Sequence, residues 1–516
     1  MPRLPASFIT IAPFAGTVAF ILLFWTSAYG PGVSPDSIIY LETAVSVASG
    51  EGFYANGEPM THYPPAYPLL LAVGSLMGPN ILATSRVLHA AFFGMNAALV
   101  ATAVHFLSNR RQLLTAASAF VLFMISAPIL SAHAMAWSDP PFVMFFIAGL
   151  FLLSLHLTSA SWLALIAAAL VVGLGMTTRY IGVTMLVPLL FSFLVLDKRD
   201  VKERGGAALV ATTVAFMPIG LWFLRNLTVA HTAANRQFAI HPFGPTHVKA
   251  LISTLSDFVL PVSLPFWAKA VHMIMWLILL LVALKAFYRS NGSDEAANQA
   301  GRLFVSLNLV FIISYLTFLV ISISFLDAYT PLDNRILLPV FTSFLMVTVL
   351  VAATVLPRQR QPAIRLTVFF FMALSLSLNS FYVVQEAQRI HREGLGYTSL
   401  AWRNSETITA VGNLDSDIRI YSNGPDVLRF WTGKDAQILP YRVFPTTLRP
   451  NEEYTAQSLE VCLAVANAGV YVVYFDKIDR RYLLTQKDLT SVCGEMRHQK
   501  LEDGIIYGRY FQSNLQ

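Results

Sequence analysis

The sequence has few charged residues and almost no cysteine. Asp, Glu, Lys and Arg together make up 12% of the 516 residues, and there are two cysteines, whereas an ordinary soluble domain carries about 25% charged residues. This scarcity of charge excludes an ordinary soluble enzyme, and the 55% of hydrophobic residues indicates an integral membrane protein. The net charge of +6 comes with no nucleic-acid signature, so nucleic acid is not an expected partner.

A membrane-spanning helix needs about 20 mostly apolar residues, and the sequence contains eleven candidates. The first follows Arg3 and is too long for a signal peptide, so we expect it to remain as an uncleaved span. The candidates lie near residues 8–29, 81–107, 112–131, 139–157, 162–178, 180–196, 205–224, 266–287, 303–325, 336–356 and 366–385.

Basic clusters between the spans predict which side of the membrane each loop faces. The clusters are Arg110 with Arg111; Lys198, Arg199, Lys202 and Arg204; Lys285, Arg289 and Arg302; and Arg358, Arg360 and Arg365. All fall on one side if eleven spans are threaded in order, and lysine and arginine gather on the cytoplasmic side. We therefore expect the first loop (30–80), a long loop (225–265) and everything after about residue 386 to lie outside.

The chain becomes polar near residue 386, which predicts a transmembrane domain over 1–385 and a small extracytoplasmic α/β domain over 386–516. "DIRIYSN" and "GVYVVYF" are typical of strands, "PDVLRFW" and "SLEVCLAVANA" of helices, and "KLEDGIIYGRYF" of a hairpin that turns at Asp503-Gly504. Both cysteines, Cys462 and Cys493, lie in this external part. A disulfide stays open, because the sequence does not give the separation of their Cα atoms.

The first external loop holds a carboxylate near the membrane surface. Ser34 and Pro35 predict the start of a short interfacial helix, and "YPPAYPLLLA" predicts a second one. Asp36 then lies at the root of the first helix. An ionised carboxylate beside hydrocarbon tends to mark function, although Asp36 could merely stabilise the helix N-terminus.

A second carboxylate and four arginines are expected on the same outer side. Asp139 starts the fourth predicted span, where it is either functional or a helix-start residue. Arginines should avoid this side, yet four sit at the outer ends of spans: Arg86, Arg179, Arg225 and Arg335. One could be a snorkelling side chain, but four on one face suggest an anionic ligand, most naturally a lipid phosphate.

These residues resemble the GT-C superfamily of membrane glycosyltransferases, which use polyprenyl-phosphate-linked sugars. Protein O-mannosyltransferases and the lipid A aminoarabinose transferase are members. The similar stretches run in order through about residues 20–345. They are "PDSIIYLETA", "GEGFY", "YPPAYPLLLA", "TSRVLHAAF", "SDPPFVMFF", "TRYIG" and "NRILLPVF".

The resemblance implies a GT-C-like fold and roles for several side chains. Asp36 matches the first-loop acidic residue that these enzymes are thought to use as a general base, and Asp139 matches a position that helps to place acceptor or donor. A phosphate-facing role is implied for one or more of Arg86, Arg179 and Arg335. Aromatic residues of the first loop either stack on a sugar or form an interfacial belt; they are Tyr40, Phe53, Tyr54, Tyr63 and Tyr67.

The sequence departs from the family pattern before the paired prolines. Relatives of the aminoarabinose type have charged residues there, whereas this chain has His62-Tyr63. If His62 pairs with His231, His241 or His247, a divalent metal could bridge them; otherwise His62 is an ordinary hydrogen-bonded histidine. No other cofactor is expected.

The expected function is therefore that of an inverting hexosyl- or pentosyltransferase acting on cell-envelope glycans. The donor would be a polyprenyl-phosphate-linked sugar, and the acceptor a lipid, glycan or protein hydroxyl. We expect a bacterial inner-membrane location with the active site and the C-terminal domain on the periplasmic side. A transporter or flippase for a lipid-linked saccharide is the main alternative, but it should carry ionisable residues in mid-span. A noncatalytic scaffold is the third.

Overall fold

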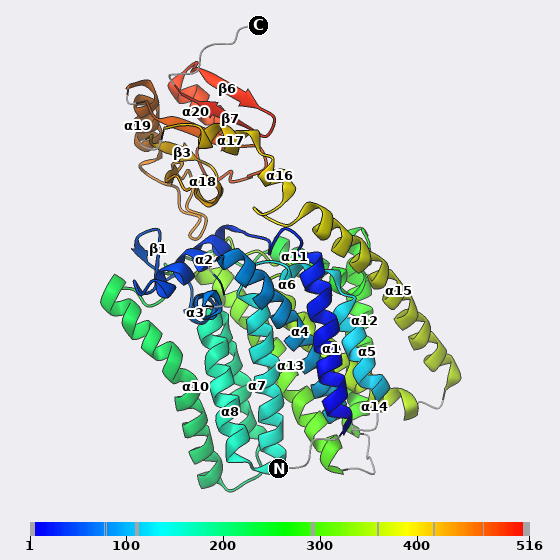
Figure 1. Cartoon of the computed structure of the whole chain (residues 1–516). Helices are drawn as coiled ribbons and strands as arrows, with labels where there is room; N and C mark the ends of the chain where they lie inside the picture. The colour runs from blue at the N-terminus through cyan, green and yellow to red at the C-terminus, as the bar shows by residue number, and fades with distance from the viewer. Residues whose placement is uncertain are drawn as a thin grey trace.

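Long apolar helices form most of the computed structural model (Figure 1). It describes residues 6–76, 78, 80–108, 113–289, 295–358, 361–415, 418–467 and 469–508. The helices of the membrane part are α1 (Ala6–Thr26), α4 (Ile81–Leu107), α5 (Leu113–Met124), α6 (Ala127–His133), α7 (Asp139–Ser159), α8 (Trp162–Thr178), α9 (Leu186–Phe191), α10 (Val201–Ala230), α11 (Pro245–Val259), α12 (Phe266–Arg289), α13 (Glu295–Phe325), α14 (Leu338–Val355) and α15 (Pro362–Glu393).

Six of the described helices are long and apolar enough to cross a membrane, or seven spans if α5 and α6 count as one bent span. The chain is thus a mainly helical, polytopic membrane protein, as predicted. The count of eleven spans is not confirmed. Arg110, Arg111 and Arg360 lie outside the described residues.

Two predicted spans are irregular. The run 112–131 is not one straight helix, because α5 and α6 meet at 67°, just before Pro128, which cannot continue a helix from α5. The run 180–196 consists of a 3-10 turn (η1, Tyr180–Met185), α9 and a π-helical turn (η2, Ser192–Leu196). A Cβ on Gly182 would lie 2.6 Å from the Gly175 carbonyl oxygen, so only glycine lets η1 fold back on α8. This sharp return places Arg179 at the end of the bundle.

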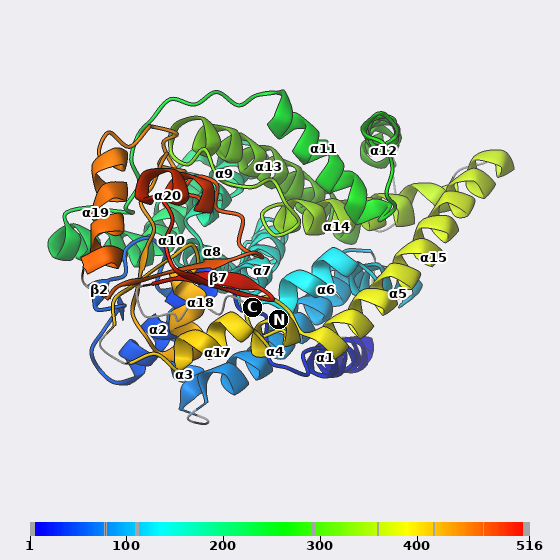
Figure 2. The same ribbon diagram turned by 90° about the horizontal axis from the view of Figure 1, so that it is seen from above.

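The first external loop lies across one end of the bundle, beneath the C-terminal part (Figures 1 and 2). It contains α2 (Pro35–Ala48), a small hairpin of β1 (Tyr54–Ala55) and β2 (Glu58–Pro59), and α3 (Ala66–Ser75). The predicted start of α2 is confirmed: Ser34 Oγ accepts a hydrogen bond from the Ser37 amide at 3.4 Å, and Pro35 occupies the first turn. Short helices that rest on the ends of longer ones can bring loop side chains to the edge of the bundle.

Residues 395–508, here called the C-terminal module, form a five-stranded sheet with helices around it. The strand order is β4-β3-β5-β7-β6, with parallel pairing of β3 to β4 and β5 and antiparallel pairing of β7 to β5 and β6. The elements are α16 (Leu400–Arg403), α17 (Glu406–Gly412), β3 (Ile420–Ser422), α18 (Pro425–Thr432), β4 (Ala436–Ile438), α19 (Tyr454–Asn467), β5 (Tyr471–Phe475), α20 (Gln486–Cys493), β6 (His498–Leu501) and β7 (Gly504–Tyr507).

Two details of the module differ from expectation. The proposed boundary at 386 falls inside α15, which continues to Glu393. The last hairpin turns at Glu502-Asp503 instead of Asp503-Gly504, because Leu501 pairs with Gly504. The Asp503 carboxylate accepts hydrogen bonds from Ser405 and Thr407, and these bonds hold Asp503 in the turn.

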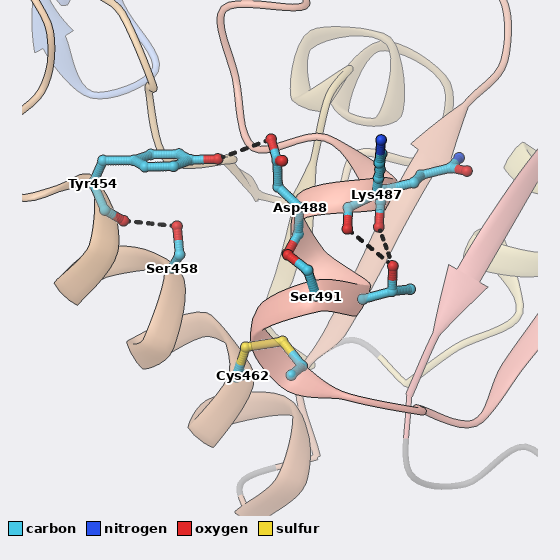
Figure 3. Close-up of a disulfide and its surroundings, with 9 residues drawn as sticks. Tyr454, Ser458, Cys462, Lys487, Asp488 and Ser491 are labelled. Carbon is cyan, nitrogen blue, oxygen red and sulfur yellow. Dashed lines mark hydrogen bonds between the residues drawn. A yellow bond between two sulfur atoms is a disulfide. The ribbon is translucent and has the colours of Figure 1, made fainter.

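Cys462 of α19 and Cys493 of α20 form a disulfide (Figure 3). The same two helices are joined by Tyr454, whose hydroxyl donates to Asp488 at 3.2 Å. The disulfide thus joins α19 to α20, at a sequence separation of 31 residues.

The module packs directly on the first loop. The Tyr397 amide donates to the Val33 carbonyl at 2.8 Å, and Arg429 of α18 forms an ion pair with Glu42 of α2 at 3.1 Å. Buried apolar residues of α2 and of the module also belong to one hydrophobic cluster. The position of α2 therefore depends on the module as well as on the bundle.

Candidate active site

Asp36 lies in the first turn of α2, with both carboxylate oxygens hydrogen-bonded. Oδ1 accepts from the Tyr63 hydroxyl at 2.7 Å, and Oδ2 accepts from Arg335 Nη1 at 2.5 Å. The Asp36 side chain is 29% exposed and that of Arg335 16%. The pair therefore sits at the rim of the bundle, where a ligand from outside can reach it.

Arg335 also contacts the second predicted carboxylate. Asp139 opens α7 with a side chain only 1% exposed; its Oδ2 accepts from Arg335 Nε at 2.9 Å, and its Oδ1 accepts from Arg179 Nη1. We call Asp36, Arg335, Asp139 and Arg179 the carboxylate–arginine chain. Negative and positive side chains alternate from Asp36 to Arg179, and the net charge of the four groups is zero.

Electrostatics keep the exposed end of this chain ionised. Burial raises the pKa of Asp36, but the charge of Arg335 and the hydrogen bonds from Tyr63 and Arg335 outweigh it, so the pKa lies below its usual value. Burial acts against the charge of Arg335, yet the two carboxylates hold its pKa well above the usual value. Burial also raises the pKa of Asp333, which accepts the Arg335 amide at 3.1 Å. Asp36 in this arrangement is a paired carboxylate and a weak base.

The first-loop tyrosines pack around Asp36. Tyr40 contacts the Tyr63 ring edge-on at 4.8 Å, and its hydroxyl lies 3.2 Å from Ser138 Oγ. Tyr40 is 2% exposed and Tyr67 is fully buried, so neither offers a free face to a sugar. Burial and the charge of Asp36 raise the pKa of Tyr63 well above its usual value, which keeps its hydroxyl protonated as a donor to Asp36.

The four arginines do not converge as expected. Arg179 and Arg335 join the carboxylate–arginine chain. Arg86 instead contacts α1, where it donates to the Phe24 carbonyl at 2.7 Å and lies 4.0 Å above the Phe24 ring. The position of Arg86 in the sequence predicts its depth in the membrane but not the neighbour that its side chain faces. The face of α4 that carries Arg86 packs against α1.

Arg225 holds the backbone of the first loop. It donates to the carbonyl oxygens of Met60 at 2.9 Å and Phe53 at 3.0 Å, and it lies 4.8 Å above the Trp222 ring. Met60 is three residues before Tyr63, so Arg225 holds the loop that carries Tyr63, the hydrogen-bond donor to Asp36. No contact of Arg225 with either carboxylate of the chain is among the described interactions.

His62 lies beside the carboxylate–arginine chain, in contact with the Tyr63 ring at 4.8 Å. Burial and the nearby charge of Arg236 lower its pKa to about 4. Within the described residues no group of three His, Cys, Asp or Glu side chains could hold a metal ion. His241 contacts the Ile323 carbonyl and His247 accepts from the Gly244 amide. A metal bridge between His62 and one of His231, His241 or His247 stays an untested alternative.

Sequence reasoning missed three residues that shape the site. The Trp137 ring lies 4.6 Å from the Arg335 guanidinium, and its indole N–H donates to Ser34 Oγ at 2.8 Å. The Tyr180 hydroxyl donates to the Thr61 carbonyl at 2.8 Å. Each missed aromatic lies within two residues of a predicted site residue, in "AWSDPP" or "TTRYIG", so proximity in sequence was the available signal. Asp333, two residues before Arg335, was missed in the same way.

A buried polar network supports the start of α7 beside Asp139. The Tyr67 hydroxyl lies 2.7 Å from His89 Nε2, and His89 Nδ1 lies 3.0 Å from the His133 carbonyl. Asn96 Nδ2 contacts His133 Nε2 and the Pro140 carbonyl, both at 2.9 Å. Because Pro140 follows Asp139, the network ties α3, α4 and α6 to the first turn of α7.

Comparison with known proteins bears on this arrangement. The model of the dolichyl-phosphate-mannose-protein mannosyltransferase family matches residues 62–222, a segment that contains Tyr63, Asp139 and Arg179. No curated protein sequence matches the chain. The crystal structure of ArnT from Cupriavidus metallidurans bound to undecaprenyl phosphate is similar with a TM-score of 0.57 at 13% identity, over 96% of this chain and 97% of that chain.

The chain has the fold of the GT-C superfamily of membrane glycosyltransferases. The apo structure of the same ArnT is similar with a TM-score of 0.50 at 12% identity, again over 96% of this chain and 97% of the other. The expected resemblance is confirmed. The similarity extends over nearly the whole chain, so it includes the C-terminal module as well as the helices.

Proposed function

We propose that the protein is an inverting glycosyltransferase that moves a sugar from a polyprenyl-phosphate-linked donor to an acceptor hydroxyl. The GT-C fold, the match to the dolichyl-phosphate-mannose-protein mannosyltransferase family and the likeness to an ArnT bound to undecaprenyl phosphate support this class of donor. The observation that carries the proposal is the partly exposed Asp36, which shares Arg335 with the buried Asp139.

The leaving group explains why one base is enough. Most glycosidases need two carboxylates, one of which protonates a poorly leaving alkoxide, whereas a polyprenyl phosphate leaves as a stabilised anion. Asp36 removes the proton of the acceptor hydroxyl while that oxygen forms its bond to the anomeric carbon. The bond between this carbon and the phosphate oxygen breaks at the same time, and the configuration inverts. The guanidinium groups of Arg335 and Arg179 stabilise the charge of the departing phosphate.

Other residues of the site act by positioning. Asp139 anchors both arginines, and Tyr63 orients Asp36 through its hydrogen bond. Arg225 fixes the loop before Tyr63. The C-terminal module covers α2, and water would compete with the acceptor as nucleophile if it entered freely.

We place the site on the outer face of a bacterial inner membrane, with the module in the periplasm. The basic clusters of the sequence favour this orientation. The acceptor would then be a lipid, glycan or protein of the cell envelope, and the sugar a hexose or a pentose.

The proposal is tested by mass spectrometry of lipid-linked sugars and envelope glycans in a strain that lacks the gene. We expect one polyprenyl-linked sugar to accumulate and one envelope component to lose that sugar. The wild-type gene should restore both, and so should Asp479→Asn, a control because this carboxylate is 66% exposed on the module. Asp36→Asn should restore neither. Rescue by Asp36→Asn would contradict the assignment of the protein as an enzyme. Movement of a lipid-linked sugar across the membrane of proteoliposomes, without a new glycosidic bond, would favour a flippase.

A further inference from the structure

We propose that the donor phosphate takes Arg335 away from Asp36 when it binds, so that the base becomes available only after the donor is in place. This inference rests on the proposed function and adds an order of events to it. One guanidinium, that of Arg335, forms ion pairs with both Asp36 and Asp139.

Asp36 is engaged at both oxygens. Tyr63 donates to Oδ1 at 2.7 Å and Arg335 Nη1 to Oδ2 at 2.5 Å. The second is a short, charge-assisted hydrogen bond, a class about twice as strong as a neutral one. A carboxylate held in this way attracts an acceptor proton weakly, because its negative charge is already neutralised by Arg335.

Arg335 can leave Asp36 without leaving the site. Its Nε stays bonded to Asp139, which is 1% exposed and is also held by Arg179. Its planar guanidinium lies 4.6 Å from the Trp137 ring, and its backbone amide donates to Asp333. Asp139 is thus the fixed end of the pair, and Nη1 is the end that faces the partly exposed Asp36.

The charge balance makes the donor phosphate compete with a carboxylate for Arg335. The four groups of the carboxylate–arginine chain sum to zero, so the chain has no excess positive charge for a phosphate until one carboxylate gives up its cation. A phosphodiester carries one negative charge and presents oxygens that match the guanidinium fork. When Nη1 of Arg335 turns to the phosphate, Asp36 keeps the Tyr63 hydrogen bond but loses the compensating charge of Arg335. Its pKa then rises, and the carboxylate becomes a stronger base.

The chemical step then balances. The acceptor oxygen gives its proton to Asp36, forms the bond to the anomeric carbon, and displaces the phosphate, which leaves with the bonding electron pair and a second negative charge. Arg335 already faces that charge. When the polyprenyl phosphate departs, Arg335 returns to Asp36 once this carboxyl has lost its proton, and the enzyme is again unable to activate an acceptor or water.

The experiment measures the affinity of polyprenyl phosphate for the full-length protein in four variants. If the phosphate must compete with Asp36 for Arg335, Asp36→Asn should bind the lipid about tenfold more tightly than wild type, within the range of ordinary coupling between sites. The gain should vanish when Asp36→Asn is made in an Arg335→Gln background. Arg335→Lys replaces Arg335→Gln if the latter does not fold. A lysine keeps a cation for Asp139 but lacks the guanidinium fork that binds Asp139 and a second anion at once, so in this background the gain should shrink. Asp479→Asn is the matched control and should bind as wild type does.

Each result has one meaning. A gain that persists without Arg335 would show simple repulsion between Asp36 and the phosphate, and it would overturn the transfer of Arg335. No gain in Asp36→Asn would overturn it too. If wild type, with its fold verified, does not bind polyprenyl phosphate at all, the proposed function fails because the chain has no site for the lipid phosphate, which is a different result from either of these.

Discussion

Replacing Asp139 with asparagine removes the charge that anchors two guanidinium groups. Asp139 is 1% exposed, Arg179 13% and Arg335 16%, so these pairs belong with buried ion pairs. Removal of one partner of a buried pair costs about 3–5 kcal/mol, because the other charge is left without compensation. The amide of asparagine keeps one acceptor oxygen, so we expect Asp139→Asn to lower the free energy of unfolding by about 3 kcal/mol, at the lower end of that range.

The assay is equilibrium unfolding in mixed micelles, combined with a double-mutant cycle between Asp139→Asn and Arg179→Gln. The two changes together should lower the free energy of unfolding by less than the sum of their single effects. In the double variant no charge is left uncompensated, because Arg335 still pairs with Asp36. Asp479→Asn is the control: its partner Arg481 is 87% exposed, and exposed pairs contribute about 0–1 kcal/mol. A loss below about 1 kcal/mol for Asp139→Asn would refute the argument that burial makes this anchor strong.

Three further predictions concern residues away from the reacting atoms. Arg86→Gln should change the rate of sugar transfer by less than about twofold and lower the free energy of unfolding by about 1 kcal/mol, because Arg86 contacts Phe24 and not the carboxylates. A loss of transfer as large as that of Arg335→Gln would place Arg86 in the site. Because burial lowers the pKa of His62 to about 4, stability should fall as the pH drops from 6.5 towards 4, by at most about 1.4 kcal/mol per unit, and His62→Gln should weaken that fall; an unchanged pH dependence of unfolding would contradict this assignment. Replacing Cys462 and Cys493 with serine should cost up to about 4 kcal/mol for a loop of this length, an effect that a reductant should reproduce on wild type and not on the variant.

Local patterns predicted the elements better than the membrane topology. Ser34 and Pro35 define the start of α2 because capping depends on neighbouring residues alone. The bend between α5 and α6 and the irregular run from Tyr180 to Leu196 depend on how proline and glycine are used in packing. A hydropathy average over about 20 residues shows that a segment is apolar but not where its helix bends or breaks.

The sequence indicated charged residues of the candidate site but not the contacts between them. The spacing and sidedness of the spans indicated Asp36, Asp139 and several arginines, but each was assigned a separate role. The sequence could not show that Arg335 bridges two carboxylates that are 103 positions apart, since the contact depends on how α2, α7 and the residues before α14 meet. For the same reason Arg86 was grouped with residues that it does not contact.

The most direct test of the central claim uses purified protein in proteoliposomes with a polyprenyl-phosphate-linked sugar and an envelope acceptor extract. Product formation is measured for wild type and for Asp36→Asn, after binding of polyprenyl phosphate has been verified for both. We expect Asp36→Asn to bind the lipid and to transfer sugar at least about 100-fold more slowly, as for the loss of a general base. Transfer at the wild-type rate by Asp36→Asn would contradict the account.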